Sequence, residues 1–181
     1  MKKLSSVAAI AASMFFATSA MAQKGAWEMS FAGNIESSTD SYSGGGSTDS
    51  KSTYVNVDVG RYFTDKLVGR VSVGLFGTDS GGNKTTMMNV GVGVKYYFGE
   101  AAASKWVPFV NGGFNVAQMD AGAISASGFG AILGGGVSHF MTEQVSMDLS
   151  LQAFTNSMST SNNFDYTNSG SRILFGITAR Y

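Results

Sequence analysis

The side chains that could support catalysis are few. His139 is the single histidine of the 181 residues, and the chain contains no cysteine. Ser138 and Glu143 lie near His139 in the sequence, so a serine, an imidazole and a carboxylate are available for nucleophilic chemistry. However, Ser138 and His139 are neighbours in a segment that alternates like a β-strand, and neighbouring residues of a strand point to opposite faces. We therefore predict no catalytic residues.

The sequence also lacks the residues and patterns that metal, cofactor and nucleic-acid sites require. A single imidazole and the lack of thiols exclude the common zinc ligand sets. Residues 128–134 resemble a dinucleotide-binding glycine pattern only faintly, because the glycine spacing differs and no helix is expected after them. The chain balances 12 Lys and Arg against 12 Asp and Glu, without the basic excess that nucleic-acid binding requires. We predict no metal, no cofactor and no nucleic-acid partner.

A set of charged residues falls on the polar face of alternating segments: Glu28, Asp58, Arg70, Lys95, Asp148 and Arg180. Three acids and three bases suit a neutralising network in a narrow interior, because an isolated buried charge is costly. We predict that Asp58 lies near Arg70, across the turn at Asp65, and that Glu28 lies near Arg180, where the first and last segments meet. A pore or proton path is the alternative interpretation.

Period-two alternation is the dominant pattern, and it recurs in eight segments at about residues 26–35, 55–60, 67–75, 88–98, 110–116, 128–138, 145–152 and 172–181. One face of each segment is aliphatic or aromatic, and the other holds Gly, Ser, Asn and a few charges. In a soluble β-sandwich the bulky apolar face points inward and the outward face is charged. Here the polar face is made of small residues with few charges, so the bulky face should meet lipid and the small polar face should fill the interior. Because an open sheet edge is prohibitive in lipid, we predict an all-β, eight-stranded, antiparallel, up-and-down transmembrane β-barrel.

Residues 121–141 offer a different interpretation. They contain no Asp, Glu, Lys or Arg, and a membrane-spanning helix could be drawn there. The six glycines of this stretch, and the strands that would lose their neighbours, favour a barrel strand instead.

The connections alternate in length. Short turns are expected at 64–66, 99–105 and 141–144, and longer polar loops at 39–52, 78–84, 118–126 and 155–169. Residues 59–63, 94–98 and 137–141 also align as a weak repeat that precedes each short turn, so they should mark one membrane interface. This alignment places His139 with Arg61 and Tyr96 on the outward face.

The N-terminus resembles an export signal. Lys2 and Lys3 precede an apolar stretch, and Ala20 and Ala22 are suitably small for cleavage before Gln23. We predict a signal peptide at 1–22 and a barrel domain at 23–181, exported to a bacterial periplasm or outer membrane.

On these features the chain resembles the small eight-stranded outer-membrane β-barrels of Gram-negative bacteria, the OmpX/Ail-like group and the broader outer-membrane β-barrel domain family. The most specific part is the aromatic-terminated end, residues 176–181, although Ala179 departs from the aromatic often found there. The resemblance implies that Phe175, Gly176, Ile177 and Tyr181 form an assembly signal for the barrel-assembly machinery. Tyr181 should lie in the periplasmic aromatic girdle.

The resemblance also implies location in the cell outer membrane, in contact with its lipid and with lipopolysaccharide. It does not fix an activity. We expect a structural or adhesive surface protein without catalysis, with loops 39–52 and 155–169 available to a host or phage ligand. The alternatives are a small diffusion channel, a conduit for hydrophobic ligands and, in third place, a lipid A-modifying enzyme.

Overall fold

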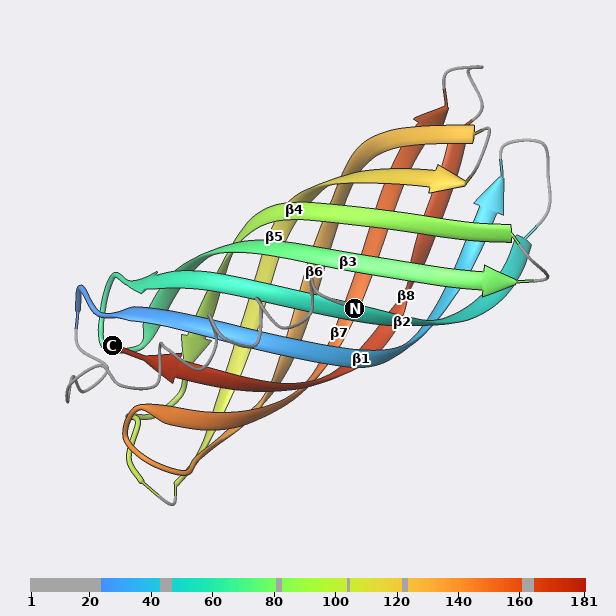
Figure 1. Cartoon of the computed structure of the whole chain (residues 1–181). Coiled ribbons are helices and arrows are strands. Elements are labelled where there is room, and N and C mark those ends of the chain that lie inside the picture. Colours follow the sequence, from blue (N-terminus) through green and yellow to red (C-terminus); the bar gives the residue numbers. More distant parts are fainter. Residues whose placement is uncertain (1–23, 43–46, 81–82, 104, 122–123, 161–164) are drawn as a thin grey trace, which may run out of the picture.

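The computed structural model describes residues 24–42, 47–80, 83–103, 105–121, 124–160 and 165–181, which form one closed antiparallel barrel (Figure 1). Each strand pairs with its sequence neighbours, and β8 returns to β1. The strands are β1 (Trp27–Tyr42), β2 (Ser47–Tyr62), β3 (Leu67–Ser80), β4 (Asn83–Tyr97), β5 (Trp106–Ala121), β6 (Ile124–Phe140), β7 (Val145–Thr160) and β8 (Asp165–Arg180). The predicted fold class is confirmed.

The stretch that invited a helical interpretation is strand β6, fully paired with β5 and β7. No helix among the described residues is long and apolar enough to cross a membrane.

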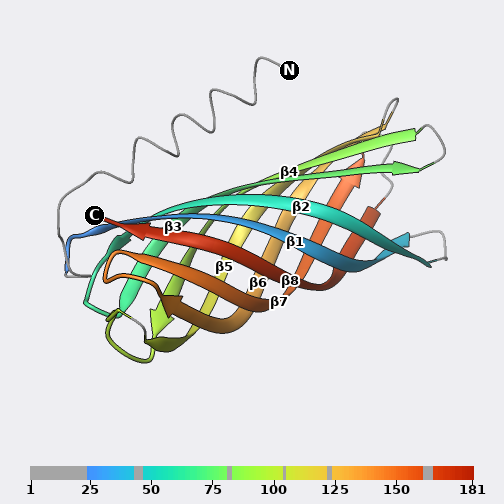
Figure 2. The same ribbon diagram turned by 60° about the horizontal axis from the view of Figure 1, so that its bottom comes forward.

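Strands β1 and β8 close the barrel, and they lie side by side in Figure 2. Their register runs from Glu28 opposite Arg180 to Tyr42 opposite Tyr166. Beyond it, the Trp27 amide donates to the Tyr181 carbonyl at 2.7 Å, and the Tyr181 amide donates to the Trp27 carbonyl at 3.0 Å. The ladder is thus continued to the last residue, and the closing seam exposes no unpaired edge to lipid.

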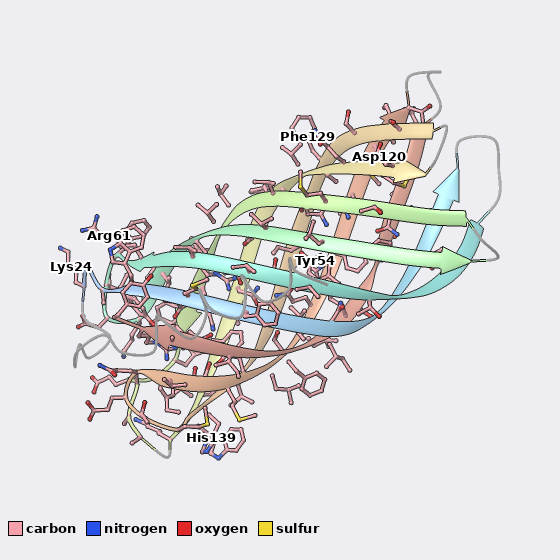
Figure 3. The ribbon with its side chains drawn as sticks, in the orientation of Figure 1. Lys24, Tyr54, Arg61, Asp120, Phe129 and His139 are labelled. Carbon is pink, nitrogen blue, oxygen red and sulfur yellow. The ribbon has the colours of Figure 1, made fainter. Side chains whose placement is uncertain are left out.

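The outward face carries the large apolar side chains. Phe114, Phe129 and Leu133 are 74%, 76% and 71% exposed, respectively, and Figure 3 shows the Phe129 ring pointing away from the barrel wall. Such exposure of phenylalanine and leucine is unfavourable in water and favourable in hydrocarbon. The outside of the barrel is therefore a lipid-facing surface.

The two ends of the barrel differ. The end that carries Trp27, Tyr181 and the connections 63–66, 98–105 and 141–144 is here called the proximal end, and the opposite end the distal end. The short turns agree with their predicted positions. The four predicted long loops require correction, because strands occupy most of them: β1 continues to Tyr42 and β8 begins at Asp165. Cross-strand pairing of polar Ser, Thr and Asn residues extends the ladder, and only short tips fall outside the described residues.

The interior also differs from the expected face of small polar residues. Two apolar clusters occupy it at different depths. The proximal cluster contains Tyr62, Val68, Tyr97, Val107, Phe109 and Phe140. The distal cluster contains Tyr54, Phe76, Met87, Ala117, Ala126, Met158 and Leu174. Inward glycines on neighbouring strands make room for some of these side chains: the Tyr54 phenol packs over Gly74, and the Val68 side chain packs over Gly60.

Gly93 and Gly113 show this close approach most directly. They are cross-strand partners on β4 and β5. A Cβ atom on Gly113 would lie 2.5 Å from the Val92 carbonyl oxygen, whereas one on Gly112, which faces outward, would meet nothing closer than 3.4 Å.

We expect Gly113→Ala to lower the free energy of unfolding by roughly 1–3 kcal/mol, because backbone must move to admit the methyl group. The matched variant Gly112→Ala should be close to wild type. The measurement is urea unfolding in detergent, with folded and unfolded protein separated by their different gel mobility before boiling. Equal stability of the two variants would contradict the close-approach interpretation.

Candidate functional site

The barrel interior holds three ion pairs between the six charged residues identified from the sequence. Arg70 Nη1 lies 3.2 Å from Asp58 Oδ2, and both side chains are at least nine-tenths buried. Lys95 Nζ lies 2.8 Å from Asp148 Oδ2 and joins β4 to β7 across the lumen. Each charge therefore has a partner of opposite sign, which offsets part of its desolvation cost.

The third pair, Arg180 with Glu28, is fully buried. Arg180 Nη2 lies 3.5 Å from Glu28 Oε2, and neither side chain is exposed. Tyr62 and Tyr97 complete the group, because each hydroxyl donates to Glu28 Oε2, at 2.9 and 3.0 Å. The same hydroxyls accept from Arg180 Nε and Nη2, both at 2.7 Å. Four strands, β1, β2, β4 and β8, are thereby tied together at the proximal end.

Aromatic rings pack around these charges. The Arg180 guanidinium carbon lies 4.3 Å from the Phe140 ring centroid, and Lys95 Nζ lies 4.1 Å from that of Phe109. Tyr62 and Tyr97 are stacked with centroids 6.3 Å apart. Ion pairs and rings together fill the proximal end of the lumen. The members of the proximal cluster are at most 5% exposed.

Small cavities lie on the distal side of the filled proximal end of the lumen. One of about 30 Å³ is lined by Asp58, Arg70, Lys95 and Asp148, among others, and a second of the same volume borders Arg70 and Arg172. Such volumes hold a few water molecules at most. A shallow hollow of about 480 Å³ opens at the distal rim, where Gln118, Asp120 and Ser127 line it.

The residues considered for catalysis are not brought together. Ser138 is buried in the interior, whereas His139 points outward from β6 (Figure 3). The imidazole stacks on Trp106 with centroids 4.3 Å apart, and Glu143 is exposed in the connection after β6. The outward position predicted for His139 is the one observed. Among the described residues, no group of three or more His, Asp or Glu side chains could hold a metal ion.

Sequence reasoning missed the tyrosine pair and one interior cation. Tyr62, Tyr97 and Phe140 occupy equivalent positions of the weak repeat, one residue after the outward Arg61, Tyr96 and His139. Extending the alternation by that one residue would have identified an inward aromatic layer. Arg172 is also buried: its guanidinium carbon lies 4.2 Å from the Tyr54 ring centroid, and its Nε donates to Gln152 at 3.1 Å.

The residues of the expected assembly signal fall on both faces of β8. Phe175 and Ile177 are exposed to the outside, whereas Gly176 lies on the inward register. Tyr181 is partly exposed beside Trp27 at the proximal end. The expected cleavage site at Ala20, Ala22 and Gln23 lies outside the described residues.

A closed barrel with an apolar exterior and an interior filled by its own side chains is a transmembrane β-barrel protein. The sequence matches the model of the outer membrane protein β-barrel domain over residues 8–176, and the chain belongs to this family. It is accordingly a protein of the outer membrane. In such barrels the extracellular extensions are the longer ones, which makes the proximal end periplasmic and the distal end extracellular.

Solved structures share the fold at low sequence identity. Neisserial surface protein A (NspA) aligns with a TM-score of 0.63 and 14% identity, covering 87% of this chain and 98% of its own. OprG of Pseudomonas aeruginosa gives 0.57 and 10%, covering 90% and 99%. The N-terminal barrel domain of OprF from the same species gives 0.51 and 12%, covering 87% and 98%. No curated protein matches the sequence significantly.

We expect Arg70→Met to lower the free energy of unfolding by roughly 3 kcal/mol, because it leaves the buried Asp58 carboxylate without its partner. The double variant Asp58→Leu/Arg70→Met should recover most of that loss, since it removes both charges. Unfolding in urea, followed by tryptophan fluorescence in lipid vesicles, measures the three free energies. A single variant as stable as the wild type would contradict a desolvated pair.

Proposed function

We propose that the protein is a non-conducting surface protein of the outer membrane, whose contacts with other molecules are made by its distal hairpins. The observation that carries this proposal is the filled proximal end of the lumen. Tyr62, Tyr97 and Phe140 are at most 2% exposed there. Together with the Arg180–Glu28 pair they occupy the cross-section through which a solute would have to pass.

This filling disfavours the diffusion channel and the ligand conduit. An eight-stranded barrel has an interior just wide enough for its own side chains. The two cavities that border Arg70 inside the lumen have volumes of about 30 Å³ each, room for a few water molecules at most. Opening a path would require the buried Arg180 and Glu28 charges to separate within the protein, which is energetically costly.

The distal hairpins, which are the ends of the strand pairs at the distal end of the barrel, provide a surface for contacts with other molecules. They continue the strands beyond the apolar band with Ser, Thr, Asn and Asp residues, and they hold their shape through cross-strand hydrogen bonds. Ser125 donates to Asp120 at 3.0 Å, and Ser159 donates to Asp165 at 2.8 Å. Residues 36–53, 77–86, 118–127 and 155–171 carry six acidic and two basic side chains. A host or phage protein with a basic, hydrogen-bonding surface fits this composition.

A lipid A-modifying activity lacks support in the geometry. Its one imidazole, His139, is stacked on Trp106 at the periplasmic end, far from the leaflet that holds lipid A. We also propose that Phe175, Gly176, Ile177 and Tyr181 act as the signal for the barrel-assembly machinery, and that residues 1–22 are removed on export. The exposed Phe175 and Ile177 are accessible for that contact.

In planar lipid bilayers we expect the wild-type protein to show no ion conductance, because the proximal cluster fills the lumen. The triple variant Tyr62→Ala/Tyr97→Ala/Phe140→Ala removes three rings from that layer and should conduct. Its control is Phe114→Ala, which removes one outward ring and should stay silent. Discrete wild-type conductance steps, in protein verified as folded by its gel mobility, would refute the non-conducting function.

The hairpins can be shortened without changing register. Ser37 and Lys51 are cross-strand partners on β1 and β2, as are Thr155 and Ser169 on β7 and β8. Replacing residues 38–50 and 156–168 each by Asn-Gly should leave a folded barrel with two-residue turns. Cells displaying this variant at wild-type level should lose adhesion to host cells and phage adsorption. Retention of both properties would show that the hairpins are not the contact surface.

A further inference from the structure

The outward surface of β1 and β2 carries an aromatic and cationic strip at the proximal end, formed by Lys24, Trp27 and Arg61. Trp27 and Arg61 are cross-strand partners. The Arg61 guanidinium carbon lies 5.7 Å from the Trp27 ring centroid, within the range of a cation–π contact. Trp27 is 45% exposed, and Arg61 is exposed as well.

Lys24 supplies a second positive charge beside Arg61. The two backbone segments that carry these side chains are hydrogen-bonded to each other, because the Gly25 amide donates to the Tyr62 carbonyl at 2.8 Å. Figure 3 shows the Lys24 and Arg61 side chains extending from the same end of the barrel. Within the described residues, neither side chain is paired with a carboxylate. The neighbouring acid, Asp65, uses Oδ1 to accept the Lys24 backbone amide at 3.0 Å.

The strip stands where the lipid-facing band ends. Along β1, Trp27 is followed on the outward face by Met29 and Phe31, and along β2 Arg61 is preceded by Val59 and Val57. An indole prefers the membrane interface, and basic side chains reach from there into the headgroup layer. Tyr181 pairs with Trp27 from the β8 side of β1, whereas Arg61 lies on the β2 side.

We propose that Lys24, Trp27 and Arg61 form a binding site for the headgroup of an anionic phospholipid in the periplasmic leaflet. The Arg61 guanidinium carbon lies over the indole ring, and a guanidinium can donate two parallel hydrogen bonds to a phosphate. Lys24 adds a point charge. The apolar surface of Val59 and Phe31 continues in the direction of the acyl chains. A lipid can therefore contact both the cationic side chains and this apolar surface, whereas a soluble anion can contact only the cationic side chains.

The other tryptophan provides an internal comparison. Trp106 also has an outward cross-strand partner at this end, but that partner is His139, whose imidazole stacks on the indole. Lys105 is the exposed cation beside it. This second pair lacks the guanidinium that binds phosphate through two hydrogen bonds, so the β1–β2 strip should bind the anionic lipid preferentially.

The test is native mass spectrometry of the full barrel in dodecyl maltoside. The sample contains equimolar phosphatidylglycerol and phosphatidylcholine with identical acyl chains. The wild type should retain more phosphatidylglycerol, and Arg61→Gln should reduce that retention roughly fivefold, the size expected of one basic residue at a lipid surface. Lys105→Gln makes the same charge change beside Trp106 and should leave retention at the wild-type level. Gel mobility before and after boiling verifies that each variant is folded.

Three outcomes would overturn the proposal. The first is equal retention of both lipids by the wild type, and the second is equal loss in the Arg61 and Lys105 variants. The third is displacement of phosphatidylglycerol by excess inorganic phosphate, which would show a site for phosphate ions rather than for lipid.

Discussion

Backbone hydrogen bonding in lipid is the constraint on which the rest of this structure depends. No water is available in the hydrocarbon layer, so every amide and carbonyl of a spanning strand needs a partner. Eight antiparallel strands meet this requirement only if β8 returns to β1, and the ladder continues to the Trp27–Tyr181 pair. Closure then fixes the two faces of each strand. One must be soluble in lipid, and the other must fill a lumen of fixed width.

The filling of that lumen follows from its narrowness. Charged side chains directed inward cannot keep their hydration, so Asp58, Lys95 and Asp148 are each held against a partner of opposite sign. At the periplasmic end the solution is more elaborate, because Tyr62 and Tyr97 hydroxyls bridge Glu28 and Arg180. The phenol rings fill the lumen, and their hydroxyls form hydrogen bonds with the two buried charges. A purely apolar layer would lack these hydrogen bonds, and small polar side chains would leave the lumen unfilled.

Both proposed contact surfaces lie at the membrane boundaries rather than in the interior. The extracellular boundary carries stiff, acidic hairpins, since the cross-strand ladder continues well past the last lipid-facing residues. The periplasmic boundary carries tryptophan, arginine and lysine on β1 and β2. This polarity follows a common physical pattern: each end of the barrel presents the side chains suited to the layer that it meets.

The sequence by itself determined the strand number, the closed topology and the face of each charge, because a period of two assigns every residue to lipid or lumen. The pairing of Asp58 with Arg70 followed from one short turn, and that of Glu28 with Arg180 followed from closure. The tertiary structure decided what alternation leaves open. It set the depth at which Lys95 meets Asp148 across the lumen, since strands distant in sequence come together only on closure. It also turned the expected loops into strands, because polar Ser and Thr residues become cross-strand partners only once the register of the whole barrel is fixed.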